Sequence, residues 1–128
     1  MLAGPAFADE PNVRASMLCE RASEPGRVRC SIEANVDSGR TIAWGDVAIV
    51  ALPDFAAALK GRLGRDDATI REHNTYKWAF GLVAKRAGQG EARAKVRLVL
   101  CDPARDGSAP TGCAPVTVEV KATITVGG

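Results

Sequence analysis

Basic side chains that recur at every second position in the last third of the chain are the residues best suited to chemistry. Arg93, Lys95 and Arg97 alternate with apolar residues, which places the three side chains on one face of a β-strand. If the Tyr76–Lys85 strand pairs with Ala92–Leu100 so that both apolar faces coincide, Lys85 faces Arg93, which in turn faces Lys121, in a row of like charges. Like charges directly opposite one another destabilise a sheet by about 0.2 to 1 kcal/mol per pair. The row therefore predicts a surface for an anionic partner: an acidic polysaccharide, a lipid head group or an acidic protein.

The same row has a second interpretation, a solvated strand face whose long side chains splay apart, because exposed charges interact weakly. Another candidate site is the segment Asp102–Gly112, a short loop between two cysteines in which Arg105 is the strongest binding group. A loop that is tied at both ends is pre-organised for protein recognition or for protease inhibition. Its turn residues also fit a plain turn, so both interpretations of the loop stay open.

Catalytic and metal sites lack a recognisable residue set in this sequence. His73 is the single histidine and stands between Glu72 and Asn74 in a polar turn, without a nucleophile elbow elsewhere in the chain. Asp66 and Asp67 form an adjacent carboxylate pair in a loop that has no marks of a substrate groove. No phosphate-binding or dinucleotide fingerprint occurs, and the cysteine spacing does not fit zinc. We therefore expect no catalytic activity, cofactor or metal; an enzyme would require His73 in a pocket beside a nucleophile.

Four cysteines predict two disulfides that each close a short hairpin. Cys19 and Cys30 lie at about equal distances from a Glu-Pro turn and share the inward face of their strands, as a cross-strand bridge requires. Cys101 and Cys113 flank a run of turn residues. Two disulfides in a small chain indicate an oxidising compartment, so we expect a secreted or periplasmic protein.

The register of the last hairpin is predicted by the pairing of its cysteines. With Cys101 facing Cys113, Lys95 faces Glu119 on the polar side of the two strands. The apolar side then pairs Leu98 with Val116, Val96 with Val118 and Ala94 with Val120. A slip of one residue would turn one apolar face to solvent, so the alternation and the cysteine spacing support the same hairpin.

Runs of alternating apolar and polar residues predict strands over most of the remaining chain. The predicted strands are Val13–Glu20, Arg27–Val36, Thr41–Leu52, Ala68–Arg71, Tyr76–Lys85, Ala92–Leu100 and Val116–Ile124. In the third strand, Ile42 and Trp44 are expected on one face, before a bulge at Gly45-Asp46. A short helix is expected after that strand, with Asp54 as its N-cap and with Phe55 and Leu59 on one stripe.

Seven short strands at intervals of about ten residues predict an all-β fold, an antiparallel immunoglobulin-like β-sandwich. Cys30 followed by Trp44 is similar to the spacing of the strand-B cysteine and strand-C tryptophan of immunoglobulin domains. The resemblance implies the architecture alone, because Val99 stands where that family has tyrosine, two residues before Cys101. A bridge between Cys30 and Cys101 would instead indicate a true immunoglobulin domain. The alternative fold is a curled meander or barrel, since the strand pattern does not determine the order of strands in space.

Length, charge and the first residues bound the class of protein. At 128 residues and a formal net charge of +2, the chain is one domain without the strong positive charge of a nucleic-acid binder. No apolar run is long enough to span a membrane. The stretch Ala6-Phe7-Ala8 resembles the end of a secretory signal peptide. Residues 1–8 are therefore interpreted as a signal-peptide remnant or as a chance match, and residues 9–128 as the β-sandwich domain.

These features predict a non-enzymatic binding or structural module of the cell envelope. The favoured contact surface is the basic strand face, where replacement of both Arg93 and Lys121 by glutamate should abolish salt-sensitive binding. The alternative is a protein-recognition or inhibitor module that acts through the loop, where Arg105→Ala should abolish activity and the basic face should be dispensable.

Overall fold

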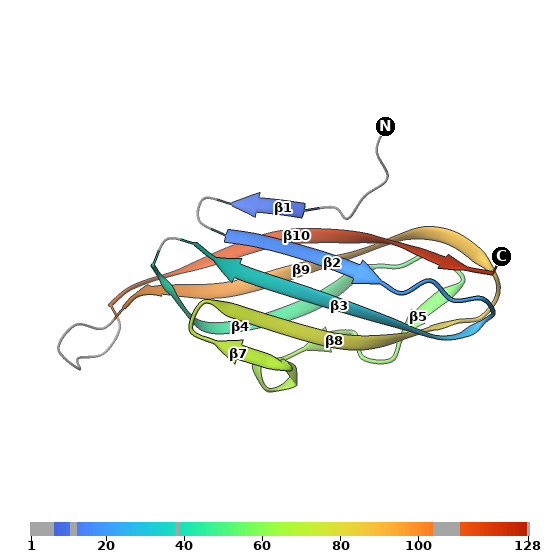
Figure 1. Cartoon of the computed structure of the whole chain (residues 1–128), viewed down its shortest axis with the longest axis horizontal. Helices are drawn as coiled ribbons and strands as arrows, with labels where there is room; N and C mark the ends of the chain where they lie inside the picture. Colours follow the sequence, from blue (N-terminus) through green and yellow to red (C-terminus); the bar gives the residue numbers. More distant parts are fainter. Residues whose placement is uncertain (1–6, 11–12, 38, 104–110, 128) are drawn as a thin grey trace.

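Ten β-strands in two facing sheets make up the computed structural model, which describes residues 7–10, 13–37, 39–103 and 111–127 (Figure 1). The first sheet has the order β1-β2-β3-β8-β5, and β7 also pairs with β8. Its strands are β1 (Phe7–Glu10), β2 (Val13–Cys19), β3 (Gly26–Val36), β5 (Ala56–Ala58), β7 (Ile70–Glu72) and β8 (Thr75–Ala84). The second sheet has the order β10-β9-β4-β6. Its strands are β4 (Thr41–Ala51), β6 (Arg62–Leu63), β9 (Gly88–Asp102) and β10 (Thr111–Val126).

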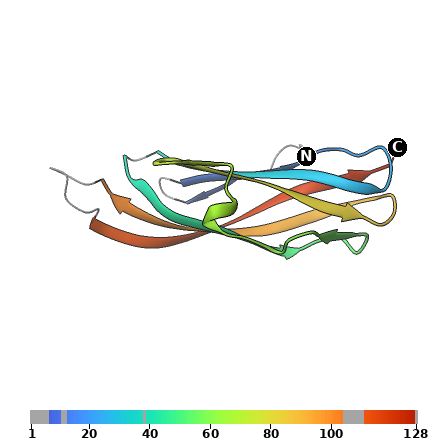
Figure 2. The ribbon, with the colours of Figure 1, turned by 90° about the horizontal axis from the view of Figure 1, so that it is seen from below.

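The fold is an antiparallel, immunoglobulin-like β-sandwich, as the strand pattern predicted. All pairs of named strands are antiparallel, and Figure 2 shows the two sheets as separate layers. The sheets do not close into a barrel, so the alternative fold is wrong. A parallel bridge between Ala22 and Val126 joins the two layers at one end. Within the described residues, helical structure is confined to one 3₁₀ turn, Arg65–Asp67, and no helix could span a membrane.

The core lies between the sheets and consists of the inward residues of the alternating strands. Ile32, Trp78 and Leu82 of the first sheet and Val96 and Leu98 of the second have 0 to 1% of their surface exposed. Burying an apolar side chain of this size contributes about 1.5 to 3 kcal/mol. The tryptophan also satisfies its one polar group, because its indole Nε1 donates to a backbone carbonyl at 3.1 Å.

Both local hairpins form with the predicted disulfides and register. Cys19 pairs with Cys30 across β2 and β3, and Cys101 pairs with Cys113 at the end of β9 and β10. Across the long hairpin the cross-strand pairs are Leu98–Val116, Val96–Val118, Ala94–Val120, Lys95–Glu119 and Arg93–Lys121, each as predicted. All four cysteines are used in these two bridges, so the Cys30–Cys101 bridge of a true immunoglobulin domain is not formed.

The expected pairing of β8 with β9 is wrong, because the chain passes from one sheet to the other between them. β8 pairs with β3, β5 and β7, whereas β9 pairs with β4 and β10. The apolar faces of β8 and β9 meet across the core instead of side by side within one sheet. Lys85, at the end of β8, therefore does not lie opposite Arg93.

The short helix expected after Asp54 is also absent, and a three-residue strand takes its place. Ala57 lies opposite Val83, which makes β5 the edge strand beside the last residues of β8. Phe55 is buried while Leu59 is 53% exposed, so the two side chains do not share one apolar stripe. The alanine-rich segment satisfies backbone groups of β8 that would otherwise be unpaired at the sheet edge.

The bulge in β4 lies two residues earlier than expected and reverses the side on which Trp44 emerges. The register with β9 shifts between Ile42 and Trp44, so Ile42 is buried and Trp44 is 37% exposed. The tryptophan that packs in the core is Trp78, on β8. The immunoglobulin-like spacing from Cys30 to Trp44 thus does not correspond to a buried tryptophan.

Candidate functional site

The outer face of the second sheet gathers most of the charged residues that the sequence singled out. We call it the charged face, formed by Trp44 and Asp46 of β4, Arg62 of β6, Glu91, Arg93, Lys95 and Arg97 of β9, and Glu119 and Lys121 of β10. These residues alternate with buried apolar residues, so the strands hold their Cα atoms in fixed register. Five cations and three carboxylates occupy this face, which leaves an excess of positive charge.

At one end of the charged face the cations are balanced by glutamates. Arg93 Nε donates to Glu91 Oε1 at 2.8 Å, and Arg93 Nη1 lies 3.8 Å from Glu119 Oε1. Lys121 Nζ lies 3.9 Å from Glu91 Oε2. The hydrogen bond from Arg93 lowers the pKa of the Glu91 carboxyl. The predicted like-charge pair of Arg93 and Lys121 is therefore present in register but compensated by carboxylates on either side.

At the other end, two arginines meet on a single buried carboxylate. Arg97 donates from Nε to Asp46 Oδ1 at 2.8 Å and from Nη2 to Asp46 Oδ2. Arg62 Nη1 donates to the same Oδ2 at 2.9 Å. The Asp46 side chain is 5% exposed, whereas those of Arg62 and Arg97 are 60% and 46% exposed. The hydrogen bond from Arg97 lowers the pKa of the Asp46 carboxyl and outweighs the opposing effect of burial.

Lys95 completes a group of three cations on β6 and β9, the two strands that flank β4. Ala48 of β4 lies between Arg62 of β6 and Lys95 of β9, and Arg97 is two residues further along β9. In the described part of the chain Lys95 forms no ion pair, because its cross-strand neighbour Glu119 contacts Arg93. We call Arg62, Lys95 and Arg97 the cation triad. One buried carboxylate balances these three charges.

An aromatic ring adjoins the cation triad. The guanidinium carbon of Arg97 lies 5.6 Å from the centre of the Trp44 ring, a cation–π geometry. Trp44 keeps 37% of its surface exposed on the same face. The site therefore presents positive charge and a flat apolar surface side by side.

The structure separates or leaves out two of the predicted site residues. Lys85 follows β8 in the first sheet, away from the charged face, and Arg105 lies outside the described residues. Trp44, Asp46 and Arg62 were missed. The bulge in β4 decides the outward direction of the first two, and Arg62 belongs to a two-residue strand too short to have a sequence pattern.

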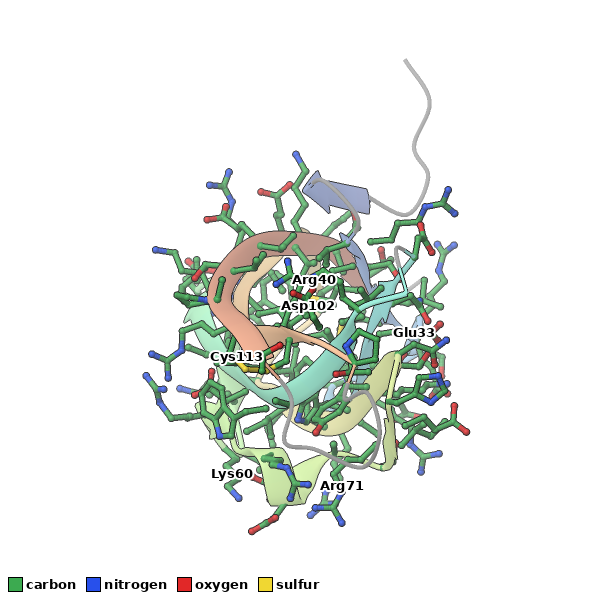
Figure 3. All side chains as sticks on the ribbon, turned by 90° about the vertical axis from the view of Figure 1, so that its left-hand side faces the viewer. Glu33, Arg40, Lys60, Arg71, Asp102 and Cys113 are labelled. Atoms are coloured by element: carbon green, nitrogen blue, oxygen red, sulfur yellow. A yellow bond between two sulfur atoms is a disulfide. The ribbon has the colours of Figure 1, made fainter. Side chains whose placement is uncertain are left out.

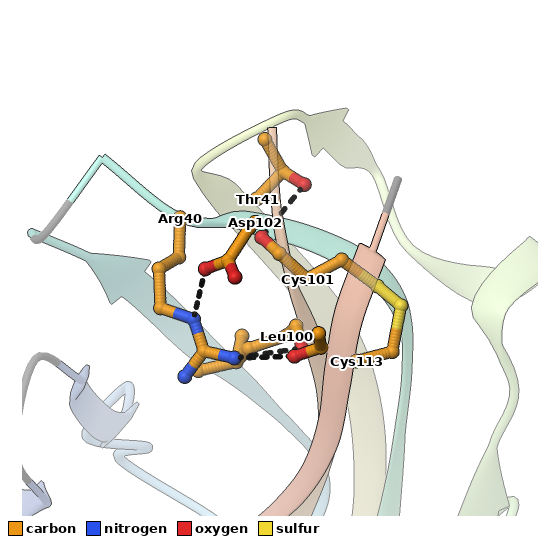
Figure 4. Close-up of a disulfide and its surroundings, with 7 residues drawn as sticks. Arg40, Thr41, Leu100, Cys101, Asp102 and Cys113 are labelled. Carbon is orange, nitrogen blue, oxygen red and sulfur yellow. Dashed lines mark hydrogen bonds and ion pairs between the residues drawn. A yellow bond between two sulfur atoms is a disulfide. The ribbon is translucent and has the colours of Figure 1, made fainter. Parts of the chain in front are cut away.

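Arg40, the residue before β4, contacts the end of the β9–β10 hairpin beside the Cys101–Cys113 disulfide (Figure 4). Arg40 Nη2 donates to the carbonyls of Leu100 at 3.1 Å and Gly112 at 3.0 Å, and its Nε lies 3.5 Å from Asp102 Oδ1. Figure 3 shows Arg40, Asp102 and Cys113 together at this end of the sandwich. The arrangement fixes the end of β9 and β10 and needs no ligand to explain it.

The residues considered for catalysis are either exposed or engaged in ion pairs. His73 is exposed in the turn between β7 and β8, so it does not meet the requirement of a pocket beside a nucleophile. Asp67 binds Lys60 Nζ at 2.8 Å, and Asp66 lies 3.1 Å from Arg71 Nη1. Across the described ranges, histidine, cysteine and acidic side chains form no group of three that could hold a metal.

Comparisons with known proteins identify no family for the chain. No family model and no curated protein matches the chain. It is similar to the GAE domain of GGA2p from Saccharomyces cerevisiae, at 12% identity and a TM-score of 0.45, covering 91% of this chain and 94% of that one. A GH20 exo-β-N-acetylglucosaminidase from Vibrio harveyi matches at 14% identity and a TM-score of 0.43, covering 91% and 19%. A structure of Escherichia coli AAF fimbriae matches at 13% identity and a TM-score of 0.32, covering 88% and 98%. These similarities carry no argument about what this chain binds.

Proposed function

We propose that the protein is a non-enzymatic binding module, secreted or periplasmic, that contacts an anionic partner through its charged face. The observation that carries the proposal is the composition of this face, where five cations stand against three carboxylates, one of them 5% exposed. Such an excess of charge on one surface attracts anions over several ångströms, and the attraction weakens as salt is added. It is also the kind of feature that directs partner choice.

The scaffold supports a binding role. The charged side chains project from paired strands, so little backbone entropy is lost when a partner is bound. Two disulfides tie the ends of the hairpins and fit an oxidising compartment. The exposed position of His73 and the ion pairs of Asp66 and Asp67 fit a module without catalysis.

The test is binding to labelled polyanions at low and high salt. The probes are heparin, polygalacturonate, polyglutamate and vesicles that contain phosphatidylglycerol. The test variant is Lys95→Glu with Lys121→Glu, which reverses two exposed charges on the charged face. The matched control is Arg27→Glu with Arg29→Glu, which makes the same change in net charge on β3 of the opposite sheet.

We expect the wild type to bind at least one polyanion with an affinity that falls as salt rises. The charged-face variant should lose about tenfold or more in affinity, and the control variant less than about twofold. Equal losses in both variants would show that net charge alone is responsible and would overturn the proposal. Thermal melting of each variant confirms that it is folded before binding is compared.

A further inference from the structure

The cation triad points to a more specific ligand than an unspecified polyanion. Arg62 of β6 and Lys95 of β9 pair with Ala48 from opposite sides, and Arg97 stands two residues further along β9, opposite Asp46. Neighbouring strands are about 4.8 Å apart, and alternate residues of one strand are about 6.8 Å apart. Ala48, the residue between Arg62 and Lys95, carries only a methyl group, and the guanidinium groups of Arg62 and Arg97 meet at Asp46, two residues away along β4.

Asp46 orients the two guanidinium groups and leaves most of their hydrogen-bonding capacity unused. Both of its oxygens are occupied, and Arg62 and Arg97 meet on the same oxygen, Oδ2. A guanidinium has five N–H donors. Asp46 takes two from Arg97 and one from Arg62, so both groups retain donors that the exposed parts of the side chains can direct outward. The buried carboxylate thus acts as a holder and is itself shielded from a bound anion.

We propose that the cation triad binds one sulfate ester group of a sulfated polysaccharide, with a sugar ring of the polymer lying against Trp44; this rests on the anion-binding function proposed above. Donors from three cationic side chains can serve the three free oxygens of a sulfate ester. A planar carboxylate is matched by a single guanidinium fork. Trp44 offers a partly exposed aromatic surface beside the triad. An anionic group carried on a ring satisfies both features at once.

The polymer is expected to continue along β9 toward Arg93 and Lys121. These cations stand on the same face, but Glu91 and Glu119 compensate them. Their contribution to binding is therefore smaller than that of the triad. The difference between the cation triad and these compensated cations distinguishes a specific binding site from a diffuse electrostatic attraction.

The experiment compares three polymers that share one backbone: dextran sulfate, carboxymethyl dextran and unmodified dextran. Vesicles that contain phosphatidylglycerol form a fourth arm, because lipid phosphates also offer several oxygens. The variants are Lys95→Gln in the triad and Lys121→Gln as a control that removes the same charge from the other end of the face. Lys95→Arg tests rescue by a conserved charge, and Trp44→Ala tests the ring contact. Arg97 is left unchanged because it holds the buried Asp46.

We expect dextran sulfate to bind more tightly than carboxymethyl dextran of equal charge density, and unmodified dextran not to bind. Lys95→Gln should weaken dextran sulfate binding about fivefold, whereas Lys121→Gln, at the compensated end of the charged face, should weaken it only about twofold. Lys95→Arg should restore binding, and Trp44→Ala should weaken it without changing its dependence on salt.

Three outcomes would overturn the inference. Equal losses from Lys95→Gln and Lys121→Gln would show that no triad seat exists, although the anion-binding function would stand. Equal affinity for the two modified dextrans, or a preference for the vesicles, would reject sulfated polysaccharide as the ligand class. Binding of none of the polyanions in either experiment would remove both the inference and the function on which it rests.

Discussion

At the scale of single residues, the buried carboxylate of Asp46 links the stability of the fold to pH. Its pKa is lowered in the folded protein, chiefly by the hydrogen bond from Arg97. A group with a lowered pKa stabilises the fold above its unfolded pKa, and this contribution is lost as the pH falls through the folded pKa. The relevant window therefore lies below about pH 4, where an unfolded aspartate gains its proton.

Asp46→Asn should lower the free energy of unfolding at pH 7 by about 1 to 2 kcal/mol, because two neighbouring guanidinium groups lose the charge that balances them. The difference between variant and wild type should shrink as the pH falls below about 4, since the unfolded wild-type chain then binds a proton at this carboxyl, whereas the folded protein, with its lowered pKa, binds it only at a lower pH. Urea denaturation at a series of pH values measures it. A difference that stays constant down to pH 2 would contradict the assigned role of the charge.

Arg40 is a second residue whose replacement should lower the free energy of unfolding. Its guanidinium donates to the carbonyls of Leu100 and Gly112, which are 60 and 72 residues away in the chain. Arg40→Ala should lower the free energy of unfolding by about 1 to 2 kcal/mol, because these backbone acceptors lose a charged donor. Arg14→Ala is the control, since the ion pair of Arg14 with Asp37 is exposed and should contribute no more than a few tenths of a kcal/mol. Similar losses in the free energy of unfolding for Arg40→Ala and Arg14→Ala would show that the contacts of Arg40 with the hairpin do not stabilise the fold.

At the scale of elements, the two hairpins were predictable from the sequence and the pairing of β8 was not. Cysteine spacing and alternation agree on the register of β9 with β10, since both signals are local and one residue of slip would expose an apolar face. Alternation also shows which face of β8 is buried. It does not show which strand lies beside it, and the apolar faces of β8 and β9 are satisfied equally well across the core.

The charged face was only partly predictable for the same physical reason. Arg93, Lys95, Arg97 and Lys121 belong to the hairpin whose register is determined locally, and they lie together as predicted. The triad depends on β4 and β6, which are brought to β9 by contacts distant in sequence. The bulge before Trp44 shifts the register of β4 with β9 by one residue, and the composition of the segment did not show where this shift occurs.

The disulfides belong to this scale because each one closes a single hairpin. The bridged cysteines are separated by 11 and 12 residues. In the chain-entropy model, loops of this length stabilise a protein by about 3 kcal/mol each. Replacing both Cys101 and Cys113 by alanine should therefore lower the free energy of unfolding by about this amount, as should replacing Cys19 and Cys30. Denaturation in urea checks both; a loss confined to one pair would show that the loop-closure account is wrong.

At the scale of the whole molecule, the sandwich depends on how closely its sheets approach. Gly45 of β4 marks a close contact in the core, because a Cβ atom there would lie 2.9 Å from Leu98 Cδ2 of the same sheet and 3.2 Å from Trp78 Cη2 of the facing sheet. Gly45→Ala should force these side chains apart and cost about 1 to 3 kcal/mol. Gly61→Ala is the control, since nothing lies within 4 Å of its added Cβ. A melting temperature of Gly45→Ala equal to that of the control would indicate a looser interface between the sheets.

Both disulfides join cysteines that are consecutive along the chain, which has a consequence for how the protein matures. Four cysteines allow three pairings. One of these pairings joins the first cysteine to the second and the third to the fourth, and it forms if the cysteines are oxidised in the order in which they are synthesised. For Cys19–Cys30 and Cys101–Cys113 this order of arrival gives the native pairing directly. The first bridge can close before the second pair of cysteines has been synthesised. Oxidation of the cysteines in the order of synthesis would therefore give the native disulfides without isomerisation.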